Sequence, residues 1–189
     1  MLCFYAEIEE AKTTRPPMAI AVMGGGCFWC LEGVLRSLSG VISVLPAYAG
    51  GESKNPDYNN VCSGKTGHAE VVVIEFDEEI ITFETLLEVF FTIHDPTQLN
   101  RQGNDVGTQY RSCIMPMEAE QAATIERIIG EMRSNFDSPI VTTIEKAINL
   151  TIAEEYHHDY FAKNPDNRYC QVMINPKLTK VRARFAHLF

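Results

Sequence analysis

The chain has 189 residues, and 46% of them are hydrophobic, which is enough to form one sizeable core. Its formal net charge of −9 argues against binding to the phosphate backbone of a nucleic acid. No apolar run approaches the roughly 20 residues that a membrane-spanning helix needs, so we expect neither a nucleic-acid nor a membrane partner.

The N-terminal segment begins with apolar residues, but it lacks the basic residues that open a secretory signal peptide. We therefore expect residues 1–17 to form a flexible leader before a single domain over residues 18–189. Six cysteines in a chain without an export signal argue against a disulfide framework. They favour a reducing, cytoplasmic compartment in which thiols are kept for chemistry.

Hydrophobic patterning predicts the order of the elements along the chain. Apolar runs predict strands over residues 18–23, 41–48, 69–76 and 109–115, with a weaker strand over 140–146. Helical periodicity predicts helices over residues 28–38, 83–93 and 117–136, and shorter helices over 152–161 and 176–186. Glycine, asparagine, aspartate and proline predict long irregular loops over residues 49–68, 94–108 and 163–169.

This order of strands and helices is typical of two split βαβ units. We therefore predict an α+β fold, a ferredoxin-like α/β plait with its helices on one face of the sheet. Long irregular loops and a C-terminal extension complete it. Thr82 is the predicted N-cap of the helix over residues 83–93.

Cys27 stands where the first predicted strand turns into the first predicted helix, directly after Gly24, Gly25 and Gly26. Unpaired N–H groups and the positive end of the helix dipole favour an anion there. We therefore expect the pKa of Cys27 to lie below the usual value of about 8.5, which would make it a thiolate nucleophile. The alternative is a glycine turn beside a small buried cysteine that does no chemistry.

Three further residues lie at the ends of predicted strands and can serve such a nucleophile. Glu70 begins a buried strand, where burial would raise its pKa and let it hold a proton at neutral pH. Tyr48 and Tyr110 end or precede other strands, and each phenol can donate a hydrogen bond into a cleft. The residues alone leave an alternative open, in which Glu70 faces water and the two tyrosines lie on the rim of the protein with their hydroxyls in water. Asp105 lies in a loop rich in glycine and asparagine, where an aspartate by default forms a turn.

The sequence argues against a metal site. His157 and His158 are adjacent, so on a helix their side chains would point about 100° apart, and no His–x₃–His spacing exists. Cys27 and Cys30, even with Cys62, lack the second cysteine pair of a usual structural zinc site. We predict no metal and no other cofactor.

Taken together, these segments resemble the peptide-methionine (S)-S-oxide reductases, the A-type methionine sulfoxide reductases. The resemblance extends from about residue 18 to the C-terminus and is specific, because several motifs occur in one order. The matching stretches are Gly-Cys-Phe-Trp at 26–29, Ala-Tyr-Ala-Gly-Gly at 47–51, residues 61–70, residues 104–112, Glu-Tyr-His at 155–157, and residues 164–170.

The resemblance implies a role for each site residue. Cys27 would be the nucleophile that attacks the sulfoxide sulfur, and Glu70 would protonate the sulfoxide oxygen. Tyr48 and Tyr110 would assist Glu70 by hydrogen bonds to that oxygen. The residues that would line or shape the substrate site are Phe28 and Trp29, which would hold the methyl group, together with Asp105 and His157.

The expected product of the attack is methionine and a sulfenic acid on Cys27, which a second thiol can convert to a disulfide. Cys30 and Cys170 are the candidates for this resolving thiol. Cys30 stands where the family frequently has glycine, and Cys170 matches a position where the family often carries a recycling cysteine. We expect both to take part, with Cys170 in a mobile, exposed tail that passes the disulfide to thioredoxin. The sequence also departs from the common pattern of the family at His158, where glutamine is frequent.

The interpretation is therefore a cytoplasmic monomer that acts on free and protein-bound methionine sulfoxide. Two alternative hypotheses exist. A thioredoxin-like oxidoreductase would use the Cys27–Cys30 pair alone, but it leaves Glu70 without a role and places tryptophan inside the motif rather than before it. A non-catalytic domain that binds a metal or another ligand is the second rival.

Overall fold

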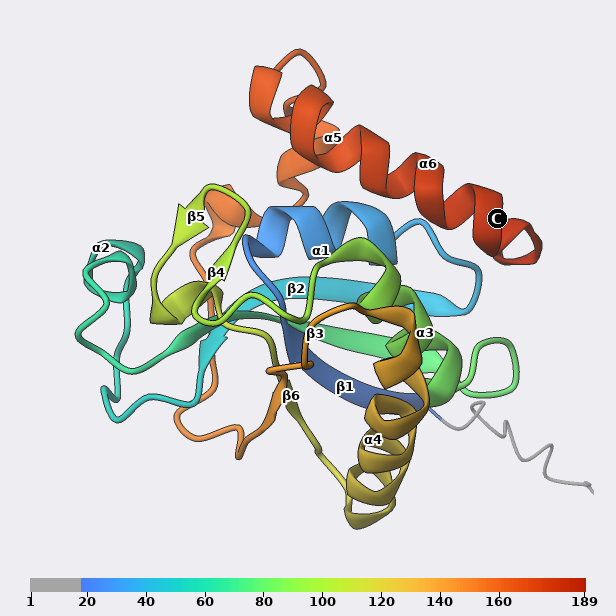
Figure 1. Cartoon of the computed structure of the whole chain (residues 1–189). Coiled ribbons are helices and arrows are strands. Elements are labelled where there is room, and N and C mark those ends of the chain that lie inside the picture. Colours follow the sequence, from blue (N-terminus) through green and yellow to red (C-terminus); the bar gives the residue numbers. More distant parts are fainter. Residues whose placement is uncertain (1–17) are drawn as a thin grey trace, which may run out of the picture.

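The computed structural model describes residues 18–189, so the predicted leader over residues 1–17 lies outside the described residues. A six-stranded sheet with the strand order β7-β6-β1-β3-β2-β8 forms the centre of the molecule (Figure 1). All of its strand pairs are antiparallel except β6 with β7. The strands are β1 (Met18–Gly24), β2 (Val41–Ala49), β3 (Ala69–Asp77), β6 (Cys113–Met115), β7 (Thr143–Ile144) and β8 (Thr151–Ile152).

The three long strands form where the sequence predicts them, because each is an almost continuous apolar run that is buried in the sheet. In the β2–β3 pair, Tyr48 lies directly opposite Glu70. Side chains of directly opposite residues lie on the same face of a sheet. This register therefore brings two of the predicted site residues to the same face.

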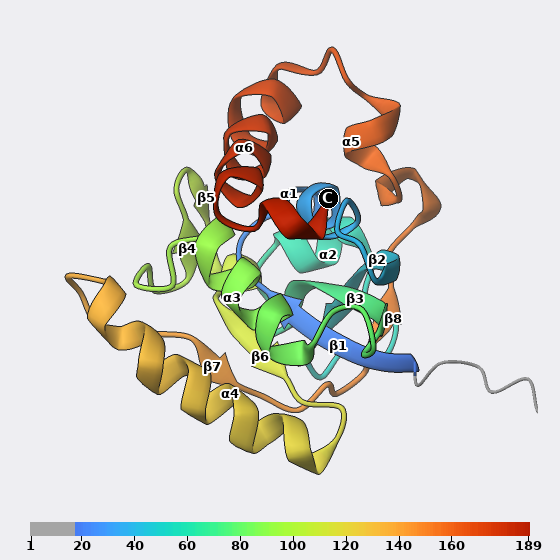
Figure 2. The ribbon, with the colours of Figure 1, turned by 90° about the vertical axis from the view of Figure 1, so that its right-hand side faces the viewer.

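The main core lies between this face of the sheet and the helices. Helices α1 (Phe28–Leu35), α3 (Phe83–Ile93) and α6 (Asn175–Arg184) pack against one another, and α6 lies over the other two on the side away from the sheet (Figure 1). Helix α4 (Ala119–Met132) packs beside α3 (Figure 2). Thr82 caps α3 as predicted, because its hydroxyl accepts a hydrogen bond from the backbone N–H of Thr85 at 3.1 Å.

The opposite face of the sheet carries a smaller apolar cluster. Val22, Ala47, Val71 and Met115 belong to it, and Leu150, from the segment before β8, packs against it. The mixed architecture of helices and a central sheet is as predicted, and the sheet is mainly antiparallel. Among the described residues, no helix combines the length and the apolar character needed to cross a membrane.

The predicted long loops contain short ordered elements. Helix α2 (Tyr58–Cys62) lies in the first, and a hairpin of β4 (Arg101–Gln102) and β5 (Asp105–Val106) lies in the second. The strand predicted over residues 109–115 is wrong in its first half, where the chain forms a 3₁₀ helix, Thr108–Tyr110. The backbone N–H of Tyr110 donates to the carbonyl of Gly107 at 3.0 Å, so this segment turns instead of extending.

The helix predicted over residues 152–161 is also wrong. The chain there forms β8, a 3₁₀ helix (Glu155–His157) and a separate helix α5 (Tyr160–Lys163). Asp159 interrupts the helical path because it adopts a left-handed conformation with φ of 57°. The buried carboxylate of Glu32 stabilises this break, since it accepts hydrogen bonds from the N–H groups of Asp159 at 2.7 Å and Tyr160 at 3.2 Å.

Cys170 does not lie in an exposed tail, contrary to the expectation from the sequence. It begins a π-helical turn, Cys170–Ile174, that continues directly into α6. Its side chain is buried in the main core together with Cys30. The irregular composition before it ends at Tyr169, and the turn that follows packs against α1, with Cys170 and Ile174 buried in the main core.

Candidate active site

Cys27 is the N-cap residue of α1 and lies beneath the surface, with 9% of its area exposed. The turn before it requires glycine, because Gly26 has a φ of 92° and a Cβ there would lie 2.7 Å from Cβ of Gln102. This turn carries the chain from the end of β1 into α1. The cysteine is thus placed at the helix start, as the glycine pattern indicates.

Glu70 is an acidic group in contact with this helix start, and 1% of it is exposed. Its Oε2 accepts a hydrogen bond from the backbone N–H of Phe28 at 3.1 Å. Burial raises the pKa of Glu70 to about 8, and the hydrogen bond from Phe28 opposes this effect only in part. The carboxyl group therefore holds a proton at neutral pH, in the direction that the sequence predicts.

The pKa of Cys27 is raised, which is opposite to the sequence expectation. Burial is the largest cause, and the hydrogen bond to Cys30 and the charge of Glu70 act in the same direction. The first N–H of the helix, that of Phe28, is occupied by the Glu70 carboxyl rather than by the thiol. The hydrogen bond with Cys27 lowers the pKa of Cys30 to about 7, so Cys30 carries most of the thiolate character of the pair.

The two predicted tyrosine donors have different surroundings. The hydroxyl of Tyr48 donates to Oε2 of Glu154 at 2.8 Å, so its proton is already engaged. Burial raises the pKa of Tyr48 and of Tyr110, which keeps both phenols protonated. The charge of Glu70 raises the pKa of both phenols further, and Tyr48 lies opposite Glu70 in the β2–β3 pair.

Glu154 is a residue that the sequence analysis did not single out. Its other carboxylate oxygen accepts the backbone N–H of Tyr58 at 2.9 Å, so it links Tyr48 to helix α2. No local pattern distinguishes this glutamate from its neighbour Glu155. Its partners lie about a hundred residues away in the sequence, and only the fold brings them together.

An aromatic cluster lies beside Cys27. The ring of Phe28 is 4.9 Å from the ring of His157, and Nε1 of Trp29 donates to Nδ1 of His157 at 3.1 Å. Trp29 stacks on Tyr160 with ring centroids 3.7 Å apart and an angle of 7° between the planes. The structure therefore brings the predicted residues Phe28, Trp29 and His157 together and adds Tyr160 and Tyr58 to them.

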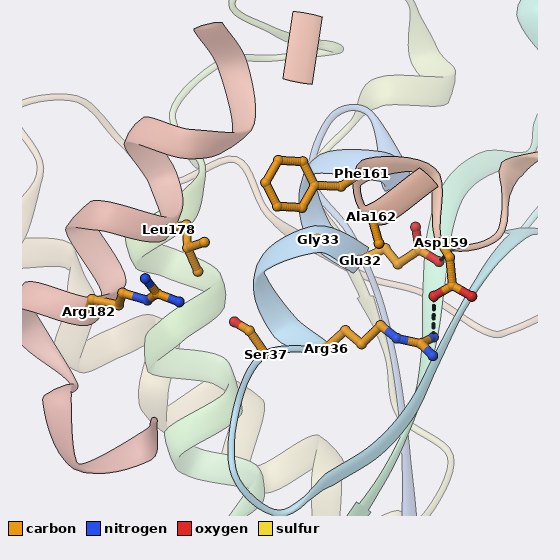
Figure 3. A pocket seen from close by; sticks show the side chains of 9 residues that line it. All are labelled: Glu32, Gly33, Arg36, Ser37, Asp159, Phe161, Ala162, Leu178 and Arg182. Carbon is orange, nitrogen blue, oxygen red and sulfur yellow. Dashed lines mark hydrogen bonds and ion pairs between the residues drawn. The ribbon is translucent and has the colours of Figure 1, made fainter. Parts of the chain in front are cut away.

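A cavity of about 270 Å³ lies behind α1, between that helix, α5 and α6 (Figure 3). None of the predicted site residues lines it. Its wall carries the Arg36–Asp159 ion pair, with 2.7 Å between Nη1 and Oδ1, and the buried Glu32 (Figure 3). Glu32 does not contact the aromatic cluster directly. It accepts the hydrogen bond from the N–H of Tyr160 at the start of α5, and the ring of Tyr160 stacks on Trp29.

Tyr169 connects Asp105 with the cysteine pair. Its hydroxyl donates to Oδ2 of Asp105 at 3.3 Å and lies 3.6 Å from Sγ of Cys30. Its ring meets Trp29 edge-on, with centroids 6.1 Å apart. The sequence reasoning missed Tyr169, although it stands next to Cys170, because the segment around it reads as an irregular loop.

The five cysteines of the described residues are all free thiols. Burial raises the pKa of Cys170, and the charge of Cys30 raises it further, so these two thiols are electrostatic neighbours. Within residues 18–189, no group of three or more histidine, cysteine or acidic side chains is arranged to hold a metal ion. His158, one of the two adjacent histidines, is engaged with the backbone carbonyl of Ala153 at 2.8 Å.

The chain is similar over most of its length to proteins of one family. Residues 19–188 match the family model described as peptide methionine sulfoxide reductase. The chain is 50% identical over 173 residues to the peptide methionine sulfoxide reductase MsrA of Chromobacterium violaceum, an alignment that covers 90% of this chain and 98% of that protein. It is 55% identical over 165 residues to MsrA of Haloquadratum walsbyi, covering 87% of this chain and 95% of that protein.

Solved structures give the same result. Mxr1 from Saccharomyces cerevisiae in its reduced form superposes with a TM-score of 0.77 at 35% identity, covering 81% of this chain and 89% of that one. Methionine sulfoxide reductase A of Corynebacterium diphtheriae superposes with a TM-score of 0.76 at 32% identity, covering 82% and 78%. The chain belongs to the peptide methionine sulfoxide reductase family.

Proposed function

We propose that this protein reduces the S epimer of methionine sulfoxide, free or in proteins, to methionine and thereby repairs oxidised proteins. Membership of the family supports the reaction. The observation that carries the proposal is the buried, proton-holding Glu70 at the start of the helix that Cys27 caps. Reduction of a sulfoxide needs both a sulfur nucleophile and an acid, because the oxygen is a poor leaving group until it is protonated.

In the first step, Sγ of Cys27 attacks the sulfoxide sulfur while Glu70 gives its proton to the oxygen. General acid catalysis of this kind contributes about 10²–10⁴ to a rate. The proton of the Cys27 thiol passes to the carboxylate that Glu70 leaves behind, since both groups lie at the start of α1. The step leaves methionine, a sulfenic acid on Cys27 and a protonated Glu70, so atoms and charge balance.

The substrate would lie against the aromatic cluster. Phe28 and Trp29 would hold the methyl group, and Asp105 and His157 would shape the remainder of the site. Tyr110 and Tyr48 would donate hydrogen bonds to the oxygen, and for this Tyr48 must release Glu154. A pocket that fixes both the methyl group and the oxygen leaves one exit for the third substituent, and this favours a single epimer.

Regeneration would proceed through a disulfide between Cys27 and a second thiol, with thioredoxin as the outside reductant. Cys30 is the nearer candidate, and Cys170 lies close to Cys30 in the core. Because Cys170 is buried, its part in the transfer to thioredoxin requires the turn at Cys170–Ile174 to open. No metal, flavin or nucleotide takes part in these steps.

The scaffold and the cellular setting belong to the same proposal. The strand order β6-β1-β3-β2, with α1 after β1 and α3 after β3, supports a ferredoxin-like plait of two split βαβ units. We take residues 18–189 as one catalytic domain of a cytoplasmic monomer. Size-exclusion chromatography with light scattering tests whether the protein is a monomer in solution.

The direct test is turnover of the separated S and R epimers of methionine sulfoxide with a dithiol reductant. The S epimer should be reduced, and the R epimer should react slowly or not at all. Equal rates on both epimers would contradict the assignment. Insulin reduction without any sulfoxide turnover would instead favour a general disulfide oxidoreductase.

A further inference from the structure

Tyr169 lies between the proposed substrate site and the second cysteine. Its hydroxyl is 3.3 Å from Oδ2 of Asp105 and 3.6 Å from Sγ of Cys30. The backbone holds it there, since its N–H donates to Oδ1 of Asn167 at 2.8 Å and the π-helical turn begins at the next residue. The proposed function gives this phenol no role.

The single phenolic hydrogen faces two acceptors. Burial raises the pKa of Tyr169, and the charge of Cys27 raises it further, so the phenol remains protonated. While Cys30 is a thiol, it can donate to the phenolic oxygen as the phenol donates to Asp105. When Cys30 is a thiolate, the phenol can turn its hydrogen to the sulfur, and a hydrogen bond to a charged acceptor is the stronger one.

We infer that Tyr169 is a positioning residue for Cys30, because its hydroxyl aims the sulfur of Cys30 at Cys27 and stabilises the thiolate that resolves the sulfenic acid. The inference rests on the proposed function, which supplies the sulfenic acid on Cys27. In this step the S–S bond forms and the S–O bond of the sulfenic acid breaks. The sulfur of Cys27 is reduced, that of Cys30 is oxidised, and the hydroxyl leaves as water with the proton that Cys30 gives up.

The charges around Cys30 agree with this role. The hydrogen bond with Cys27 lowers the pKa of Cys30 most, burial opposes it, and Lys177 and Tyr169 lower it further, while the charge of Asp105 raises it. The groups that face Cys30 are Cys27 at the start of α1, Glu70 on β3, Asp105 on β5, Tyr169 and Cys170 at the π-helical turn, and Lys177 on α6.

The test is Tyr169→Phe, which keeps the ring and removes the hydroxyl. The protein is mixed with one equivalent of S-sulfoxide and no reductant, and methionine release and loss of free thiols are followed separately. Methionine release should stay within about twofold of the parent, which also reports an intact fold. Thiol loss should slow about tenfold or more, and the midpoint of its pH dependence should rise, because the thiolate loses a donor.

Two further variants make the result specific. Tyr156→Phe removes a hydroxyl from a tyrosine that is 60% exposed, and it should change neither step. In the Cys30→Ser background, adding Tyr169→Phe should alter the lifetime of the sulfenic acid by less than about twofold, since the sulfur that the Tyr169 hydroxyl positions is absent.

The inference would be overturned if Tyr169→Phe slowed the consumption of the sulfenic acid equally in the parent and in the Cys30→Ser background. It would also be overturned if Tyr169→Phe alone left the rate of thiol loss and its pH midpoint unchanged. Absence of methionine release from the parent protein would instead refute the proposed function. The two failures are therefore distinguishable in one experiment.

Discussion

Replacing Glu70 with glutamine tests the acid of the proposed reaction with little change of shape. The glutamine oxygen can still accept the hydrogen bond that the N–H of Phe28 donates to Oε2 at 3.1 Å. What the substitution removes is the proton. Since the pKa of Glu70 is about 8, roughly nine-tenths of the parent carries that proton at pH 7.

The expected loss is at least about 10²-fold in the rate of sulfoxide reduction, the low end of general acid catalysis. The parent rate should also fall as pH rises through about 8, because the active form of Glu70 is the protonated one. The glutamine variant should lack this alkaline fall. Rapid-quench measurement of methionine in a single turnover separates this step from regeneration.

Glu75→Gln is the matched control, because Glu75 lies on the same strand and its carboxylate binds the hydroxyl of Ser43 at 3.2 Å instead of the helix start. It should leave the single-turnover rate within about twofold of the parent. A Glu70→Gln rate within about threefold of the parent, with the alkaline fall retained, would show that another group protonates the oxygen.

The same substitution also changes how the free energy of unfolding depends on pH. The folded-state pKa of Glu70, about 8, lies above the ordinary value of 4.5, so its stabilising effect is full below 4.5 and is lost as pH rises through 8. Glu70→Gln should therefore have a higher free energy of unfolding than the parent at pH 9, and denaturant titration at pH 5 and pH 9 measures this difference.

Three other substitutions test the remaining parts of the site. Cys27→Ser should abolish turnover, because a serine alkoxide is not available near neutral pH; activity within tenfold of the parent would identify another nucleophile. Trp29→Phe removes the hydrogen bond to His157 and should raise KM several-fold more than it lowers kcat, and unchanged kinetics would remove Trp29 from the substrate site. Cys170→Ser should leave single-turnover methionine release intact but sharply reduce thioredoxin-driven cycling, and undiminished cycling would make Cys30 the sole resolving thiol.

The parts of the fold that the sequence predicts well depend on local pattern. The strands β1, β2 and β3 are long apolar runs, and α3 has both a strong apolar periodicity and a capping threonine. Their observed ends lie within a residue of those predicted. The placement of Cys27 also follows from a local signal, because three glycines between a strand and a helix leave few other geometries.

The parts that the sequence mispredicts depend on contacts between distant residues. The helix predicted over residues 152–161 is broken by Asp159 because a carboxylate 127 residues earlier, on Glu32, holds its N–H. Burial of Cys170 likewise results from packing against α1, which the composition of its own segment does not indicate.

The direction of the Cys27 pKa could not be predicted either. The helix start offers a hydrogen-bond donor to an anion, but the fold brings the carboxyl group of Glu70 to that donor instead. Burial is the largest cause of the raised pKa of Cys27, and the long-range contact that brings Glu70 to the helix start adds to it, so the nucleophile is protonated before the substrate binds.

The central claim is that Cys27 takes the oxygen of an S-sulfoxide. It is tested most directly in the Cys30→Ser, Cys170→Ser double variant, with one equivalent of each epimer and a sulfenic-acid trapping reagent, followed by peptide mass spectrometry. The S epimer should release one methionine per protein and leave the trapped sulfenic acid on Cys27, and the R epimer should do neither. A label on any other cysteine, or methionine released without a sulfenic acid, would contradict the account.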